Sequence, residues 1–283
     1  MIAHFKGICY TQIVNFLIEG GPKVRLGRIQ NDFSAAGFDL VKAQGLEFIE
    51  FCCNNDEQSH RLIDAKESIK KEIARTGIDV SSVGRWNNNI QENGVIVPER
   101  LSLYLELMET AIELGAKVFV VGCNRDKSIS LYRNYENAVS FFRTLIERAD
   151  GRIKVAVEHC DWNNFITSPK QWEIVLDELP ELYLKYDASA HCYRGEDYLA
   201  PLSDWAHRVA HVHIKGVVRA GKNAVDDPPA GMDDINWPAI FAILYSRGYN
   251  GDLSIEPHSK TWSGELGNAG VLFTRDYIRK FML

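Results

Sequence analysis

The sequence has no apolar run long enough to cross a membrane, although 46% of its 283 residues are hydrophobic. A membrane-spanning helix needs about 20 consecutive, mostly apolar residues. The opening segment MIAHFKGICY lacks both the basic region and the long apolar region of a secretory signal. The 6 cysteines show no CxxC pairing and give no sign of a disulfide framework. We therefore expect a cytoplasmic protein with no membrane partner.

Excess positive charge and low-complexity segments are also missing. The chain has 32 Lys and Arg against 38 Asp and Glu, a net charge of −6. Because nucleic-acid binding depends largely on neutralising phosphates, we expect no nucleic-acid partner.

No Gly-, Pro- or Ser-rich linker divides the chain, so we predict a single domain over residues 1–283. The phosphate-binding motif GxxxxGK[ST] is absent, which leaves open whether a substrate carries phosphate.

Short apolar runs alternate with helical segments along the whole chain. Apolar residues recur at helical spacing between Pro98 and Gly115, which suit the first turn and the C-terminal cap of a helix. Strands are predicted at residues 5–9, 46–51, 79–83, 117–122, 154–160, 182–187, 209–215 and 252–256. Because continuously apolar strands alternating with helices favour a parallel sheet, we predict a (β/α)8 TIM barrel. An open doubly wound sheet is the alternative.

Two predicted loops are longer than a barrel needs. They cover residues 10–33, after the first strand, and residues 217–234, after the seventh. Long loops in a compact barrel are often lids or binding loops, and surface ornament is the alternative. We expect both loops to lie over the face that holds the functional site.

Four predicted strands end in side chains that can bind a divalent cation. These side chains are Glu158, Asp187, His213 and Glu256. Because the carboxyl ends of barrel strands open onto one face, we expect the four to meet there. A buried carboxylate is costly unless it is paired or bound to a cation, so structural ion pairs are the alternative. Three oxygen donors and one imidazole favour Mn²⁺, Mg²⁺ or Co²⁺, with Zn²⁺ as a further candidate.

Polar residues next to this set are candidates for substrate binding. Lys215 follows His213 by two residues and shares its strand face, so its amine could bind a substrate oxygen. His258 follows Glu256 by two residues and could also reach the open face. We expect His211 to point to the opposite side of its strand, toward the helices.

The motifs around these residues resemble a known family. The stretches VAVEHCDWNNF, YDASAHCYRGEDYL, HVHIKGVVR, PPAGMDDINW and LSIEPHS resemble the sugar phosphate isomerase/epimerase family of xylose isomerase-like barrels. The resemblance covers most of residues 150–283, and in the first half GLEFIEF is similar to the family's second strand, which ends at Glu50. It implies one divalent metal held by the four strand-end residues, with both glutamates also acting as acid and base.

The resemblance adds substrate-binding candidates and shows one departure. Arg219 follows His213 by six residues, which is the spacing of a substrate-binding arginine in the ketose epimerases of this superfamily. Glu50 is a further candidate. The family pattern DxSH places a histidine three residues after the metal aspartate, whereas here His191 stands four after Asp187. A shift of one residue changes where a side chain points, and His191 remains a binding candidate.

This site predicts proton transfer next to a carbonyl. A metal that chelates a keto sugar or polyol acidifies the adjacent carbon, so the two glutamates could epimerise or isomerise the substrate through an enediolate. A lyase or dehydratase of keto-inositols or keto-glycosides is the close alternative, and an abasic-site endonuclease is a more distant one.

Trp86 and Trp162 follow strands, where their rings could stack on a sugar or could pack against other side chains of the protein. A homo-oligomer is plausible for such a barrel.

Overall fold

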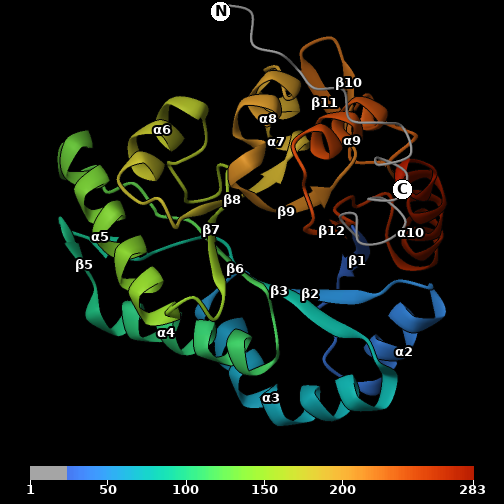
Figure 1. Ribbon diagram of the computed structural model, residues 1–283, viewed down its shortest axis with the longest axis horizontal. Helices are drawn as coiled ribbons and strands as arrows, with labels where there is room; N and C mark the ends of the chain where they lie inside the picture. Colours follow the sequence, from blue (N-terminus) through green and yellow to red (C-terminus); the bar gives the residue numbers. More distant parts are fainter. Residues whose placement is uncertain (1–23) are drawn as a thin grey trace, which may run out of the picture.

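A computed structural model describes residues 24–283, which form a closed eight-stranded parallel barrel surrounded by helices (Figure 1). Neighbouring strands follow the order β1-β12-β9-β8-β7-β6-β3-β2 around the ring. Each strand pair within the ring is parallel. The predicted TIM barrel is therefore confirmed, and the carboxyl ends of all eight strands open onto one face.

The barrel strands are short and mostly buried. They are β1 Arg25–Ile29, β2 Phe48–Cys53, β3 Asp79–Arg85, β6 Val118–Val121, β7 Lys154–Val157, β8 Tyr183–Asp187, β9 Val209–Ile214 and β12 Asp252–Ile255. Two small antiparallel pairs lie outside the ring, β4 Gln91–Glu92 with β5 Val95–Ile96 and β10 Val218–Ala220 with β11 Asn223–Asp226. The second pair forms a hairpin in the first part of the predicted loop 217–234, directly after β9.

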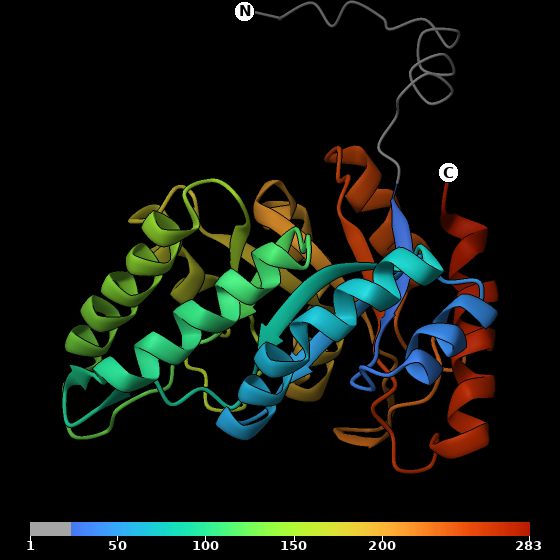
Figure 2. The ribbon, with the colours of Figure 1, turned by 90° about the horizontal axis from the view of Figure 1, so that it is seen from below.

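The helices form the outer layer of the molecule (Figures 1 and 2). They are α2 Ala35–Ala43, α3 Asp56–Thr76, α4 Pro98–Glu113, α5 Leu131–Ala149, α6 Pro169–Asp177, α7 Ala188–Arg194, α8 Leu199–Trp205, α9 Trp237–Ser246 and α10 Gly264–Ile278. Local signals fix their ends: in α3, Asn55 caps the first turn through Gln58 N–H, and Gly77 ends the helix at a φ of 73°. No helix within residues 24–283 has the length and apolar character that a membrane crossing needs.

The first barrel strand corrects the prediction for the N-terminal segment. β1 lies at Arg25–Ile29, inside the stretch 10–33 that the sequence predicts as a loop. The predicted strand at residues 5–9 lies outside the described residues. Two arginines interrupt the apolar pattern of RLGRI. Arg25 pairs with Asp252 at the amino end of the barrel, and Arg28 points outward and donates a hydrogen bond to Gln44. Because both faces of this strand carry a charged residue, a search for apolar runs does not predict it.

Small residues make room inside the barrel near its open end. A side chain at Gly84 would meet the indole of Trp86, and one at Gly122 would meet Asn88 and Glu158. Both glycines lie where β3 and β6 approach the carboxyl end of the barrel. These two glycines therefore leave room for the Trp86 ring and for the Glu158 side chain near the open end of the barrel.

Candidate active site

A cavity of about 510 Å³ opens at the carboxyl ends of the barrel strands. Its floor and walls come mainly from β7, β8, β9, β12 and the residues that follow them. The lining includes Trp86, Cys160, Trp162, Lys185, Asp187, Tyr193, His213, Lys215, Glu256 and His258. The cavity therefore lies on the face where barrel enzymes place their chemistry.

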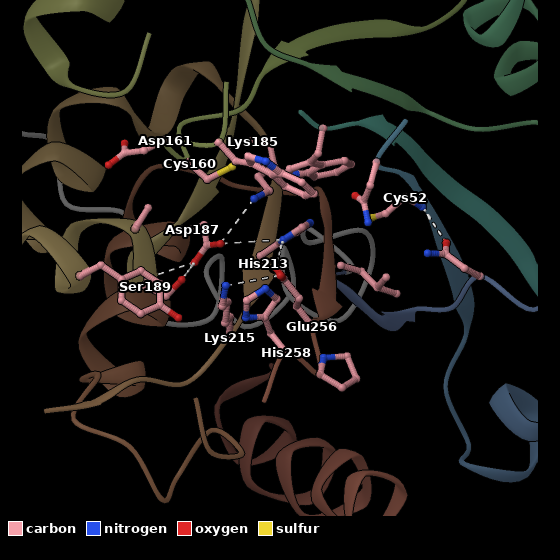
Figure 3. A pocket seen from close by; sticks show the side chains of 18 of the residues that line it. Cys52, Cys160, Asp161, Lys185, Asp187, Ser189, His213, Lys215, Glu256 and His258 are labelled. Atoms are coloured by element: carbon pink, nitrogen blue, oxygen red, sulfur yellow. Dashed lines mark hydrogen bonds and ion pairs between the residues drawn. The ribbon is translucent and has the colours of Figure 1, made fainter. Parts of the chain in front are cut away.

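Three of the four predicted metal ligands meet at the floor of this cavity (Figure 3). His213 Nδ1 lies 2.7 Å from Glu256 Oε2 and 4.0 Å from Asp187 Oδ2. One ligand atom of each of the three residues lies within 4.8 Å of the others. β8, β9 and β12 are adjacent strands, so one layer of the barrel brings these side chains together.

His213 is held from below by Glu50. Glu50 is fully buried and accepts hydrogen bonds from His213 Nε2 at 3.0 Å and from His211 Nε2 at 2.8 Å. His211 also lies 2.8 Å from Ser254 Oγ inside the barrel, so the expectation that it points toward the helices is wrong. Residues two apart in a strand share a face, and His211 and His213 therefore point the same way. Glu50 orients His213 and does not line the cavity.

The charges around His213 favour a cation at this position. Burial alone would lower the pKa of His213, but attraction by Glu50 and the hydrogen bonds that His213 donates to Glu256 and Glu50 raise it to about 9. Burial would likewise raise the pKa of Glu256, but Lys215 and His213 hold it well below its ordinary range. His213 and Glu256 thus form an ion pair. A metal ion could take the place of the shared proton, because both residues present ligand atoms to the same point.

Two lysines stand beside the same carboxylates. Lys185 Nζ lies 3.4 Å from Asp187 Oδ2, and Lys215 Nζ lies 3.5 Å from Glu256 Oε1. Sequence reasoning identified Lys215 but missed Lys185. The signal was present, because Lys185 precedes Asp187 by two residues on an otherwise apolar strand and so shares its face.

Glu158 lies apart from the three clustered residues. It is fully buried, and its two carboxylate oxygens accept hydrogen bonds from Asn88 Nδ2 at 2.7 Å and from Cys160 Sγ at 2.9 Å. It does not line the cavity, whereas Cys160 does. Burial raises the pKa of Glu158 to about 7, against the opposing effects of Cys160 and Lys185. Such a carboxyl can carry a proton at neutral pH.

The structure places His191 and Arg219 outside the cavity. His191 is buried in α7, where its Nδ1 lies 3.1 Å from Glu196 Oε2 and its ring packs against Trp172. The preceding residue, Ala190, lines the cavity instead. Arg219 lies on β10 against the cap of α7 at Gly195. The one-residue shift in the DxSH pattern thus turns the histidine inward.

The remaining sequence candidates lie around the cavity. Trp86 is nearly buried and stacks on His213 with ring centroids 6.0 Å apart, whereas Trp162 is half-exposed at the rim. His258 lines the rim, where its Nδ1 lies 2.9 Å from Asp227 Oδ2. Asp227 also accepts a hydrogen bond from Tyr193, a further lining residue that sequence reasoning missed. Asp227 of the loop 217–234 thus contacts two residues that line the cavity, although no residue of this loop lines the cavity itself.

The donor set of the cavity floor suits one divalent metal ion. Asp187, His213 and Glu256 supply two carboxylates and one imidazole, and the second nitrogen of that imidazole is bonded to a carboxylate. This carboxylate–histidine arrangement is typical of metal-binding histidines, because the outer partner fixes the ring and its tautomer. Glu158 would join the set only after its side chain leaves Asn88 and Cys160. The residue group is thus compatible with a divalent metal.

Comparison with known proteins agrees with this fold. The family model of the xylose isomerase-like TIM barrel matches residues 38–277. Among curated proteins, inosose dehydratases from two strains of Clostridium perfringens are 28% identical in an alignment over 120 residues that covers 35% of this chain. The aligned part spans only 39% of the length of those relatives.

Solved structures with the same fold include several sugar epimerases. The 3-keto-D-glucoside 4-epimerase of E. coli has a TM-score of 0.71 and 17% identity, covering 91% of this chain and all of that one. A D-allulose 3-epimerase from Methylomonas sp. has a TM-score of 0.73 and 17% identity, over 92% and 98% of the two chains. At these identities the likeness establishes the shared fold.

Proposed function

The chain belongs to the family of xylose isomerase-like TIM barrels, and on this premise we propose that it is a metal-dependent sugar isomerase or epimerase. Its substrate would be a keto sugar or polyol that loses a proton next to a carbonyl. The observation that carries the proposal is the cluster of Asp187, His213 and Glu256 at the floor of the cavity. We further propose that residues 1–283 form a single domain.

The proposed ligands are Asp187, His213 and Glu256, with Glu158 as the fourth after a side-chain rotation. A divalent ion bound there would polarise the substrate carbonyl and acidify the neighbouring carbon. Oxygen-rich coordination supports Mn²⁺, Mg²⁺ or Co²⁺ ahead of Zn²⁺. Glu50 keeps the Nδ1 atom of His213 directed at the cavity by holding its Nε2 atom.

The two glutamates are suited to opposite roles in proton transfer. Glu256 lines the cavity and has a pKa held well below its ordinary range, mainly by Lys215 and His213 against the effect of burial, so it is ionised and can accept a proton. Glu158, while it is held by Asn88 and Cys160 and is not bound to the metal, has its pKa raised by burial to about 7 and can donate one. A pair of carboxyl groups with separated pKa values is a common arrangement for acid and base catalysis. Lys215, Trp86, Trp162 and His258 would contact the sugar from the walls.

A dehydratase is the second candidate, because the local relatives are inosose dehydratases. The same proton abstraction next to a carbonyl can be followed by expulsion of a hydroxyl group from the next carbon. Only the fate of the intermediate distinguishes a dehydratase from an epimerase. An abasic-site endonuclease is less well supported, because the ends of β2 and β3 carry Cys52, Cys53 and Trp86 in place of histidine ligands.

Hydrogen exchange in D₂O tests the proposal. The Mn²⁺-loaded protein is incubated with keto hexoses, keto-glycosides and keto-inositols, and deuterium next to the carbonyl is measured by NMR and mass spectrometry. We expect exchange in wild type and a loss of at least 100-fold in Glu256→Gln and in Glu158→Gln. New sugar stereochemistry identifies an epimerase, whereas loss of water identifies a dehydratase.

A matched control for these variants is Glu92→Gln, which removes an exposed carboxylate that pairs with Arg100 on the surface. It should exchange as wild type does. Exchange that continues at the full rate after chelation of all divalent metal would contradict the proposal, as would full activity in both Glu256→Gln and Glu158→Gln.

A further inference from the structure

Three buried polar atoms in one cluster of rings have no hydrogen-bond partner among residues 24–283. They are His159 Nδ1, His191 Nε2 and Trp172 Nε1, and each of these side chains is at most 1% exposed. The centroid of the His159 ring lies 5.1 Å from that of His191 and 5.3 Å from that of Trp172. The rings of Trp172 and His191 lie 5.9 Å apart, so all three are in mutual contact. Because a buried polar group without a partner is rare, three in one cluster suggest one shared partner.

The second nitrogen of His159 determines where the proton of this ring lies. His159 Nε2 accepts a hydrogen bond of 2.7 Å from the backbone N–H of Asp187. A backbone N–H can only donate, so Nε2 carries no proton and the proton of the ring is on Nδ1. The unpartnered Nδ1 atom of His159 is therefore a donor. The indole Nε1 atom of Trp172 is also a donor, because an indole N–H has no other role.

His191 has the opposite polarity at its unpartnered nitrogen. Its Nδ1 atom lies 3.1 Å from Glu196 Oε2, a carboxylate oxygen that accepts, so Nδ1 carries the proton. Arg194 Nη2 lies 3.3 Å from the same nitrogen and donates to the Thr167 carbonyl at 3.1 Å. Burial lowers the pKa of His191, against the opposing effect of the Glu196 hydrogen bond, which favours the neutral ring. His191 Nε2 is therefore an acceptor.

Two donors and one acceptor form a set that a single water molecule can satisfy. The N–H groups of His159 and Trp172 can donate to the two lone pairs of a water oxygen, and that water can donate one proton to His191 Nε2. Buried waters typically make about three hydrogen bonds to groups that otherwise lack a partner. A direct hydrogen bond between the two imidazoles would leave the indole N–H of Trp172 without a partner.

The three side chains are connected to the cavity floor through the backbone of Asp187. This residue ends β8 and caps α7, where its Oδ1 atom accepts hydrogen bonds from the Ser189 N–H at 3.0 Å and from Ser189 Oγ at 2.6 Å. Its Oδ2 atom is left to face Lys185 and His213 (Figure 3). The hydrogen bond from its backbone N–H to His159 holds the main chain of Asp187. The direction of Oδ2 therefore depends on both sets of contacts.

We propose that one buried water molecule bridges His159, His191 and Trp172, and that this network positions the carboxylate of Asp187 for the metal ion. The second part rests on the proposed metal-dependent function, whereas the first part does not. Both histidines are positioning residues, because they act through the backbone of Asp187 and contact neither the metal nor the substrate. His191, which the sequence predicts as a substrate-binding residue, thus acts on the metal site from inside the protein.

NMR of the metal-free wild-type protein tests the bridging water without any substitution. Long-range correlation of ¹H and ¹⁵N in histidine-labelled protein should show the proton of both rings on Nδ1. The Nδ1 proton of His159 and the Nε1 proton of Trp172 should each give a cross-relaxation peak to water, and its sign in the rotating frame separates bound water from proton exchange. A missing water peak at either proton, or a proton on Nε2 of His191, overturns the bridging water.

Two variants of His159 separate positioning from packing. His159→Gln keeps an acceptor near the place of Nε2 but loses the ring, whereas His159→Phe keeps a ring and loses the acceptor. Because the partners of metal ligands typically change metal affinity by roughly 10- to 100-fold, His159→Phe should weaken Mn²⁺ binding by about that factor. His159→Gln should recover most of the loss. Calorimetric titration measures the affinity, and circular dichroism verifies folding. The reverse order of the two variants indicates packing alone and overturns the positioning role.

His207→Phe is the matched control, because His207 is exposed and its ring also stacks on a tryptophan, Trp205. This variant should bind Mn²⁺ as wild type does. The positioning role and the proposed function can fail separately. Equal Mn²⁺ affinity in wild type and both His159 variants would overturn the positioning role and leave the proposed function standing. A protein that binds no divalent metal would overturn both, whereas the bridging water is decided by NMR of the metal-free protein.

Discussion

The two ends of the barrel carry the same kinds of residues but pair them differently. β12 has an acidic residue at its amino end, Asp252, and its downstream end leads into another, Glu256, on the same strand face. Asp252 is held by Arg25 Nε at 3.0 Å, Arg25 Nη2 at 2.7 Å and Ser81 Oγ at 2.6 Å. The Arg25 guanidinium has no lone pair for a metal, and Ser81 donates its hydroxyl proton to the carboxylate. The amino end is therefore a closed structural network.

The carboxyl end is not closed in this way. Its lysines lie 3.4 to 3.5 Å from Asp187 and Glu256, and His213 presents Nδ1 to both carboxylates. These contacts include long ion pairs and an imidazole nitrogen that can be a ligand. A barrel can thus use similar residues for stability at one end and for chemistry at the other. The partners of the carboxylates distinguish the two ends: a guanidinium and a hydroxyl at the amino end, and two lysines and a histidine at the carboxyl end.

Removing the carboxylate at the amino end should have the largest effect on stability. We expect Asp252→Asn to lower the free energy of unfolding by about 3 kcal/mol, because a buried ion pair loses one partner. For a chain of this size the melting temperature would fall by roughly 6 to 12 °C. Calorimetry and deuterium exchange should show a less stable protein with wild-type activity per folded molecule.

Asp79→Asn is the matched control for this variant. Asp79 also pairs with Arg25, at 2.6 Å, but its side chain is 55% exposed. Exposed ion pairs contribute about 0 to 1 kcal/mol, so this change should be nearly neutral. Equal destabilisation by both variants would contradict the description of the amino end as a buried network.

At the carboxyl end, the corresponding test concerns metal affinity. Glu50→Gln should weaken Mn²⁺ binding by roughly 10- to 100-fold, because Glu50 fixes the ring of His213 and keeps its Nδ1 atom directed at the cavity. Calorimetric titration measures the affinity. Asp252→Asn provides the comparison and should bind Mn²⁺ as wild type does. If Glu50→Gln leaves the affinity unchanged, His213 does not depend on this partner.

Much of the carboxyl end could be predicted from the sequence. The strand-end positions of Asp187, His213 and Glu256 follow from short apolar runs and from the rule that parallel strands end on one face. The same alternation should have assigned His211 and Lys185 to the interior. His211 was placed on the wrong face although it lies two residues from His213, and Lys185 was overlooked although it lies two from Asp187.

Other features depend on contacts between distant segments and have no local signal. β1 is a barrel strand whose Arg25 pairs with Asp252 on the neighbouring strand β12, although the two residues are 227 positions apart in the sequence. The side chain of Glu158 turns toward Asn88, which comes from a different strand and loop. A sequence pattern places a residue on a strand face, but it does not determine which of several partners within reach the side chain selects.

The smallest expected effect is a difference in how the two ends respond to pH. Burial would raise the pKa of Asp252, but hydrogen bonds from Arg25 and Ser81 lower it below 3.8, so its stabilisation is present above that pH and is lost on acidification. Burial raises the pKa of Glu158 from 4.5 to about 7, so its contribution is favourable below pH 4.5 and is lost as pH rises toward 7.

Denaturant unfolding of metal-free protein between pH 3 and pH 8 measures this contrast. The unfolding free energy of wild type minus that of Glu158→Gln should fall as pH rises from about 4.5 to about 7. The corresponding difference for Asp252→Asn should be level in that range and shrink only below about pH 4. Taking differences cancels the other titrating groups. If the difference between wild type and Glu158→Gln does not change with pH, the carboxyl group of Glu158 is not desolvated in the folded protein. The physical basis for its role as an acid would then be removed.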